Sequence, residues 1–305
     1  MRQPQAFIYL LLPVLLVGSV WPLWGLPADV FTLRGIRLIN CLCAGGALSL
    51  AGLLFQQLTR NPLADPFLSG VAPAALLGQL LGILLGFQAQ ALFPLGASML
   101  VACAIGGVSL LNIRKSRTTM LLTGILLGSL CVTATQLLTY LFPTDAVIKA
   151  VSFQTLSTLD LPDTRFGIPA LCLCLMAAAM LDTRLRGSIM ALTFSTDKAH
   201  SLGLNPTLWA IGLLLLASLL TSLVTVSFGL IGFVGFLVPN LLRLTLGAGA
   251  RYTHLLAVLL GGLLLAAADG LGRLMLVPYG IPAGLVTSLI GAPFLLVVLL
   301  HRQKQ

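Results

Sequence analysis

The sequence predicts an all-α membrane protein, a polytopic bundle of about ten transmembrane helices with both termini in the cytoplasm. Hydrophobic residues make up 58% of the 305 residues and charged residues only 8%, whereas a soluble domain carries about 25% charged residues. Apolar runs of about 20 residues, long enough to cross a bilayer, recur along the whole chain. We therefore expect a single transmembrane domain over residues 1–305, with short loops.

The apolar runs define the expected spans in chain order. They lie at residues 7–27, 38–58, 67–86, 91–113, 119–142, 167–181, 208–228, 229–246, 253–269 and 281–300. The first run contains Trp21 and Trp24, which suit a membrane interface, and it is interpreted as a retained span rather than a signal peptide. The seventh and eighth runs are contiguous, and Ser227, Gly229 and Gly232 offer the place for a break between them.

Charge patterning gives the expected orientation. An N-terminus in the cytoplasm places most of the 17 basic residues on the cytoplasmic side, as the positive-inside rule requires. The acids that then fall on the outer side are Asp29, Asp145, Asp160, Asp163 and Asp269. Orientation and lipid headgroups account for the net charge of +9, so no nucleic-acid partner is expected.

The residue types needed for enzyme chemistry are scarce. The chain has no glutamate, no phosphate-binding G-x-x-x-x-G-K-[ST] loop and no nucleophile elbow. Cys41 and Cys43, like Cys172 and Cys174, are two residues apart on expected helices and point in different directions, which disfavours a shared metal. We expect no catalytic residue, no metal and no cofactor.

Small residues recur every four positions in two of the expected spans, a spacing that lets helix backbones approach closely. They are Gly78, Gly82 and Gly86, and Gly284, Ser288 and Ala292. Tight packing within the chain is one interpretation. A subunit interface is the other, and the last span suits it better.

The longest non-apolar stretch between spans is cytoplasmic and contains a short expected helix within residues 193–206. Ser195 or Thr196 can cap its first amides, and Asp197 complements the helix dipole. A helix of about two turns is unstable alone, so it must pack on its own protein or on another subunit. The candidate contact residues are Ser195, Thr196, Asp197, Ala199, Leu202 and Gly203.

Two other polar features interrupt the apolar pattern. Thr133, Gln136 and Tyr140 form one stripe on the fifth span, which suits either a translocation path or hydrogen bonds between helices. In the polar stretch 56–70, Asp65 precedes a proline, which is typical of a helix N-cap followed by proline at the first helical position.

Four motifs resemble those of the FecCD-type permeases of ABC importers for iron-siderophore complexes, haem and cobalamin. They are N-P-L-A-D-P at 61–66, A-H-S-L-G-L-N at 199–205, G-L-I-G-F-V-G-F-L-V-P-N-L-L-R at 229–243, and Ala268-Asp269 with Arg273, Ile281-Pro282-x-Gly284 and L-I-G-A-P-F at 289–294. They occur in the family's order and cover roughly residues 34–302.

The resemblance implies a transport subunit of the bacterial inner membrane, not an enzyme. A bulky iron chelate, a ferric siderophore or haem, is the implied substrate, with cobalamin as the alternative. The implied partners are a second permease copy, two ATP-binding cassette subunits seated on the 193–206 segment, membrane lipid, and a periplasmic or lipid-anchored substrate-binding protein.

The resemblance also implies docking of that binding protein on Arg34, Arg37 and Arg273. An arginine fork binds carboxylates well, although lipid anchoring explains the same residues. Asp269 precedes Arg273 by four residues and can pair with it along a helix. An ion-driven secondary transporter is the rival function, but it needs ionisable groups deep in the bundle, and only Asp269 comes close.

Overall fold

The computed structural model describes residues 28–67, 69–86, 93, 95–97, 99–101, 103–104, 117–157, 159, 167–189, 205–247, 250, 252–275 and 280–302. The expected first span at 7–27 and all six candidate contact residues between Ser195 and Gly203 lie outside these residues. The expected span at 91–113 is described only in short pieces.

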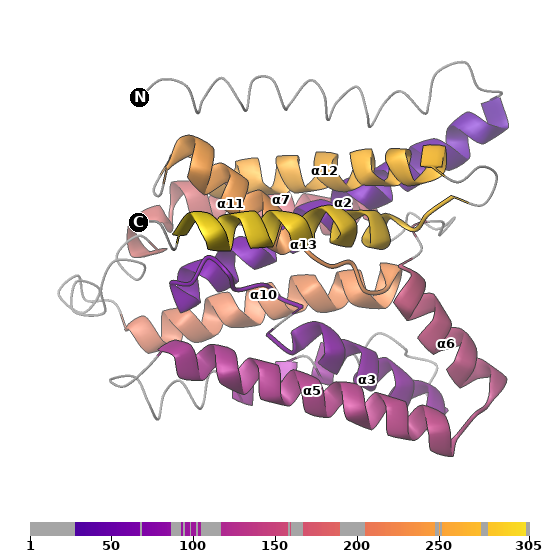
Figure 1. The fold of residues 1–305 in the computed structure, drawn as a ribbon. Helices are drawn as coiled ribbons and strands as arrows, with labels where there is room; N and C mark the ends of the chain where they lie inside the picture. The colour runs from indigo at the N-terminus through magenta and orange to yellow at the C-terminus, as the bar shows by residue number, and fades with distance from the viewer. Residues whose placement is uncertain are drawn as a thin grey trace. The chain divides into compact units, whose positions relative to one another are not determined.

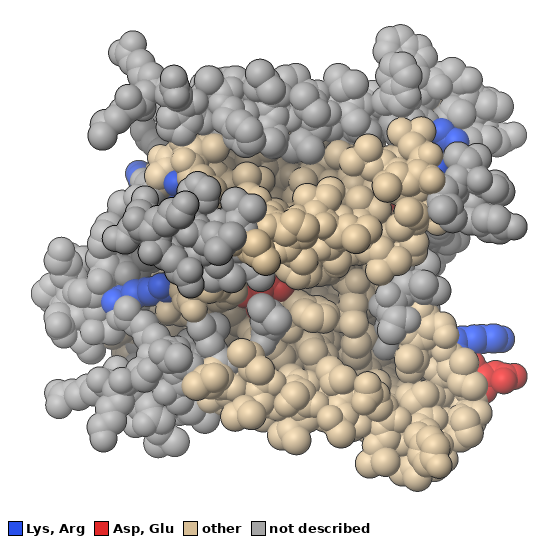
Figure 2. Space-filling view, viewed as in Figure 1, with Lys and Arg blue, Asp and Glu red and all other residues tan. Residues whose placement is uncertain are grey.

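The described residues form helices joined by turns and loops, without a strand (Figure 1). The helices are α2 (Ala28–Thr59), α3 (Val71–Leu84), α5 (Arg117–Leu141), α6 (Asp145–Leu156), α7 (Gly167–Thr183), α10 (Pro206–Phe228), α11 (Val234–Leu246), α12 (Thr253–Met275) and α13 (Ala283–Arg302). Stretches of α2, α5, α10 and α12 are long and apolar enough to cross a membrane. Figure 2 shows one face on which uncharged residues cover nearly all of the described surface. The predicted all-α membrane class is confirmed.

Several elements differ from the prediction. Helix α2 begins at Ala28, ten residues before the expected span at 38–58, because helix continues into a more polar stretch. Helix α3 begins only at Val71 because residues 61–70 form turns. Helix α6 was not predicted at all: its stretch was expected to be an outer loop, yet Thr144 Oγ1 accepts a hydrogen bond from Val147 N and supports the first turn.

The chain divides into two compact units. Unit 1 comprises residues 1–50, 157–183 and 231–305, and unit 2 comprises 51–156 and 184–230. In unit 1, α12 packs against α7, α11 and α13 (Figure 1). In unit 2, α3 packs against α5, α6 and α10.

Glycines bring α2 and α12 into backbone contact in unit 1. A Cβ atom on Gly45 would lie 2.7 Å from the carbonyl carbon of Gly261, and one on Gly262 would lie 2.9 Å from Leu42 Cα. Neither position can hold a side chain unless the helices separate. In lipid, such close approach supplies much of the packing energy between helices.

The expected four-residue spacing of small residues acts inside unit 2. A Cβ atom on Gly78 would lie 2.5 Å from Phe93 O, so this glycine is used for packing within the chain. Gly86, in contrast, has open space around it. A second pair, Gly124 and Gly128 of α5, lies against the backbone of Gly70; its spacing of four was visible in the sequence but was missed.

The break between the seventh and eighth runs lies at residues 229–233, as predicted. Gly229 and Phe233 both have left-handed backbone conformations, with φ of 81° and 67°. Gly291 of α13 leaves the space that the Phe233 side chain fills, and Thr287 Oγ1 donates a hydrogen bond to Gly232 O at 3.0 Å. These contacts fasten α13 to the start of α11 within unit 1.

Candidate functional site

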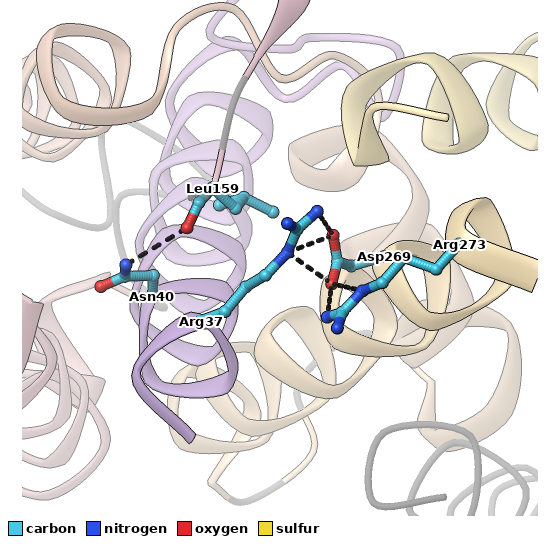
Figure 3. A network of polar contacts seen from close by, with 5 residues as sticks. All are labelled: Arg37, Asn40, Leu159, Asp269 and Arg273. Carbon is cyan, nitrogen blue, oxygen red and sulfur yellow. Dashed lines mark hydrogen bonds and ion pairs between the residues drawn. The ribbon is translucent and has the colours of Figure 1, made fainter. Parts of the chain in front are cut away.

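Two arginines from different helices of unit 1 meet on one carboxylate (Figure 3). Arg37 of α2 donates from Nε to Asp269 Oδ1 and Oδ2 at 3.1 and 3.0 Å, and from Nη2 to Oδ1 at 2.7 Å. Arg273 of α12 donates to Oδ2 from Nε at 3.1 Å and also from Nη2. We call Arg37, Asp269 and Arg273 the arginine cluster.

The arginine cluster combines a buried acid with partly exposed bases. The Asp269 side chain is 1% exposed, whereas those of Arg37 and Arg273 are 19% and 26% exposed. Two guanidinium groups thus share one carboxylate. The helical pairing of Asp269 with Arg273 is confirmed, while the contribution of Arg37, 232 positions away, was not foreseen.

The neighbouring α2 residues extend this polar face. Arg34 lies one turn before Arg37 and is half-buried. One turn after Arg37, Asn40 Nδ2 donates to the carbonyl of Leu159 at 3.4 Å, within the same unit (Figure 3). The structure therefore brings Arg37 and Arg273 together, with Arg34 on the adjoining turn of α2.

A second buried polar cluster joins the end of α7 to the start of α12. Asp182 accepts hydrogen bonds from His254 N at 3.3 Å and from Leu255 N at 2.8 Å. It also lies 2.6 Å from His254 Nδ1. An ionised carboxylate only accepts, so Nδ1 carries the proton in this contact. Asp182 thus caps α12 from another helix, a role that an N-cap residue such as Ser or Asp usually fills.

The structure places His254 in the first turn of α12, where it is 4% exposed. No local signal in the sequence links it to Asp182, because the two are 72 positions apart. After Asp182 the chain enters the stretch that carries the expected coupling residues. This stretch ends at Asn205, whose Oδ1 accepts a hydrogen bond from Leu208 N in the first turn of α10.

The expected path residues lie together on α5. Thr133, Gln136 and Tyr140 are all exposed in the single chain, Tyr140 by 82%. Thr133 Oγ1 donates to the carbonyl of Ser129 within its own helix at 2.9 Å. The stripe predicted from their spacing is therefore present and available to water, to lipid or to another subunit.

A buried hydroxyl stripe on α10 was missed by the sequence interpretation, although its spacing was visible. Its members are Ser218, Thr221, Ser222 and Thr225, each at most 3% exposed. Three of them donate to carbonyls one turn earlier in α10, at 2.8 Å. This local bonding satisfies three of the four hydroxyl groups inside an apolar unit, whereas the buried Ser222 Oγ has no hydrogen-bond partner among the described residues.

The sequence predicted a helix N-cap at Asp65, but α3 begins only at Val71, and Asp65 lies in the turn between α2 and α3. Its Oδ2 accepts a hydrogen bond from Phe67 N at 3.1 Å, and its carbonyl accepts one from Ser69 N at 3.0 Å. Gly70, with φ of 81°, ends that turn. Burial raises the pKa of the Asp65 carboxyl to about 7.

The raised pKa makes stability depend on pH through Asp65. Between its ordinary pKa and about 7, the folded protein holds a proton that the unfolded chain has released, so stability falls as pH rises through this window. We expect Asp65→Asn to be more stable than the wild type by about 4 kcal/mol at about pH 8 and equally stable near pH 4. Melting curves in detergent across this range, with Asp145→Asn as an exposed control, check this result. Parallel profiles for Asp65→Asn and the wild type would contradict it.

The described residues contain no group of three His, Cys, Asp or Glu side chains that could hold a metal ion. Cys41, Cys43 and Cys174 are buried, and Cys172 is exposed.

Comparison with known proteins identifies the family. The FecCD transport family profile matches residues 26–301. The chain is 31% identical over 302 residues to the hemin transport system permease protein HmuU of Yersinia pestis, covering 94% of this chain and 86% of that protein. It is 33% identical over 305 residues to the iron(3+)-hydroxamate import system permease protein FhuB of Escherichia coli, covering 94% of this chain but 44% of FhuB.

A solved structure shares the fold. Its name describes an inward-facing conformation of a metal-chelate type ABC transporter, and it superposes with a TM-score of 0.78 over 97% of this chain and 99% of that one, at 24% identity. The homologous proteins are permeases, that is, transport subunits and not enzymes. The chain belongs to the FecCD transport family of ABC importer permeases.

Proposed function

We propose that this chain is the membrane subunit of an ATP-driven importer that moves a bulky iron chelate, a ferric siderophore or haem, across the bacterial inner membrane. The match of residues 26–301 to the FecCD family is the observation that carries the proposal. Relatives named for hemin and for iron(3+)-hydroxamate support the substrate class. Cobalamin remains the alternative cargo.

In this proposal residues 1–305 act as one permease domain. Two copies enclose a central path, two ATPase subunits bind below, and a periplasmic or lipid-anchored binding protein delivers cargo from above. The ATPase subunits contact the segment that contains Ser195, Thr196, Asp197, Ala199, Leu202 and Gly203. Closure of the ATPase pair on ATP favours one orientation of the path because the contacts differ between the two states.

Two described surfaces support the docking of the binding protein and the lining of the path. Arg37 and Arg273, which share Asp269 and are partly exposed, suit the carboxylates of a docking protein, and Arg34 adjoins them. The exposed stripe of Thr133, Gln136 and Tyr140 suits the lining of a path between two copies.

Reconstituted liposomes test the function. The permease is co-expressed with its cognate ATPase and binding protein, and uptake of hemin, ferric hydroxamate and cyanocobalamin is measured with and without ATP inside. We expect ATP-dependent uptake of one iron chelate. Uptake that needs no ATPase subunit and collapses on adding an uncoupler would overturn the proposal in favour of an ion-driven transporter.

The proposed coupling segment predicts an uncoupled phenotype. We expect Leu202→Asp and Gly203→Pro to reduce uptake by about 10-fold or more while the permease stays folded and the ATPase still hydrolyses ATP, because the apolar face and the end of a short helix are lost. The readouts are uptake, phosphate release and elution volume of the complex. Gly187→Ala, where an added Cβ meets nothing within 4 Å, is the control in the same cytoplasmic stretch. Wild-type uptake by both segment variants would contradict the coupling role.

A further inference from the structure

We propose that Asp269 is the positioning residue of an anion-binding arginine pair: it holds Arg37 and Arg273 side by side so that together they receive one carboxylate of the substrate-binding protein. This inference rests on the docking role proposed above. It assigns a function to a buried side chain that does not itself reach the partner.

The geometry fixes both guanidinium groups from one side. Arg37 uses its Nε and Nη2 on Asp269, and Arg273 uses the same two nitrogens (Figure 3). An arginine fork held in this way has lost most of its rotamer freedom before any partner arrives. Because Arg37 comes from α2 and Arg273 from α12, the shared carboxylate is what brings the two forks together.

The charges explain why the acid must be buried. Two guanidinium groups that share one carboxylate repel each other. Asp269 offsets this repulsion, and because its side chain is 1% exposed, water screens its charge little. The Arg37 and Arg273 side chains remain 19% and 26% exposed. The arginine cluster therefore presents two guanidinium groups that are already ordered and still partly exposed, an arrangement that suits an incoming carboxylate.

This arrangement predicts that losing Asp269 changes the dissociation rate constant for docking but does not lower the association rate constant. In Asp269→Asn the cluster gains a positive charge, so electrostatic steering is not weakened and association is no slower. The arginines are no longer held, so each must be ordered in the complex, and dissociation becomes faster. We expect dissociation to accelerate by about 10-fold. If Asp269 only tied α2 to α12, Asp269→Asn would lower the melting temperature without this selective increase in the dissociation rate.

The experiment uses the permease in lipid nanodiscs and its cognate substrate-binding protein, with docking followed by biolayer interferometry. Phenylglyoxal, which modifies accessible arginines, is the second probe. We expect Asp269→Asn to increase modification of Arg37 and Arg273 several-fold, with Arg34 as the internal reference. Asp145→Asn removes the same charge from an exposed position at the start of α6 and should change neither readout.

Each outcome decides the matter. Faster dissociation with increased arginine modification supports the inference. Unchanged dissociation from Asp269→Asn while the wild type docks overturns the inference alone, whereas a wild-type permease that fails to dock overturns the proposed docking role as well. If Asp269→Asn does not assemble, Asp269→Glu keeps the charge and moves it by one methylene group. Its dissociation must then exceed that of the wild type, and an equal rate overturns the inference.

Discussion

Replacing Gly45 with alanine is expected to destabilise the permease by about 3 kcal/mol. The new methyl group would overlap the backbone of Gly261, and its other near neighbour is Leu265 Cβ at 2.9 Å. Backbone atoms cannot rotate away as the end of a flexible side chain can. Helices α2 and α12 must therefore separate along their contact, with loss of many dispersion contacts at once.

The same helix provides a matched control. Gly35 also lies in α2, but a Cβ atom there meets nothing within 4 Å, so Gly35→Ala should be neutral or should stabilise by up to about 1 kcal/mol through helix propensity. The measurement is the apparent melting temperature from fluorescence-detected size-exclusion chromatography of both variants. Equal melting temperatures for the two variants would show that the α2–α12 contact is not as close as described.

The spans could be predicted because a membrane-spanning helix needs a continuous run of apolar residues, which is visible locally in the sequence. The expected span at 208–228 therefore agrees with α10 to within two residues. Helix α6 could not be found in this way, because it is short and has no long apolar run. The late start of α3 depends on side-chain oxygens of Asn61 and Asp65, which accept hydrogen bonds from nearby backbone amides. These bonds compete with helix formation in that stretch.

The polar clusters were predictable only where their members are neighbours on one helix. The spacing of four between Asp269 and Arg273 indicated their pairing. Arg37 was selected for its charge and its motif, but its bond to Asp269 depends on how α2 and α12 pack. The glycines of α2 and α12 pose the same difficulty: Gly45 and Gly261 are visible in the sequence, but which glycine meets which is a tertiary fact.

Asp182→Ala is expected to destabilise the permease by about 3–5 kcal/mol, the range found when one member of a buried charged pair is removed. The substitution would leave three donors without their acceptor: the N–H groups of His254 and Leu255 and the Nδ1–H of the His254 ring. His254 is 4% exposed, so water cannot replace the lost carboxylate easily. The first turn of α12 would lose its cap together with the favourable charge near its N-terminus.

The substitution Asp182→Asn distinguishes the contribution of the charge of Asp182 from that of its hydrogen bonds. Asp182→Asn keeps one oxygen that can accept from Leu255 N, but it loses the second acceptor and the charge, so we expect a loss of about 1–2 kcal/mol. Melting temperatures should therefore fall in the order wild type, Asp182→Asn, Asp182→Ala, with Asp145→Ala as an exposed control. Equal melting temperatures for Asp182→Ala and the wild type would show that Asp182 does not hold α7 to α12. Because α7 ends directly before the stretch that carries the proposed coupling residues, Asp182→Ala should also abolish ATP-driven uptake at temperatures where the permease is still folded.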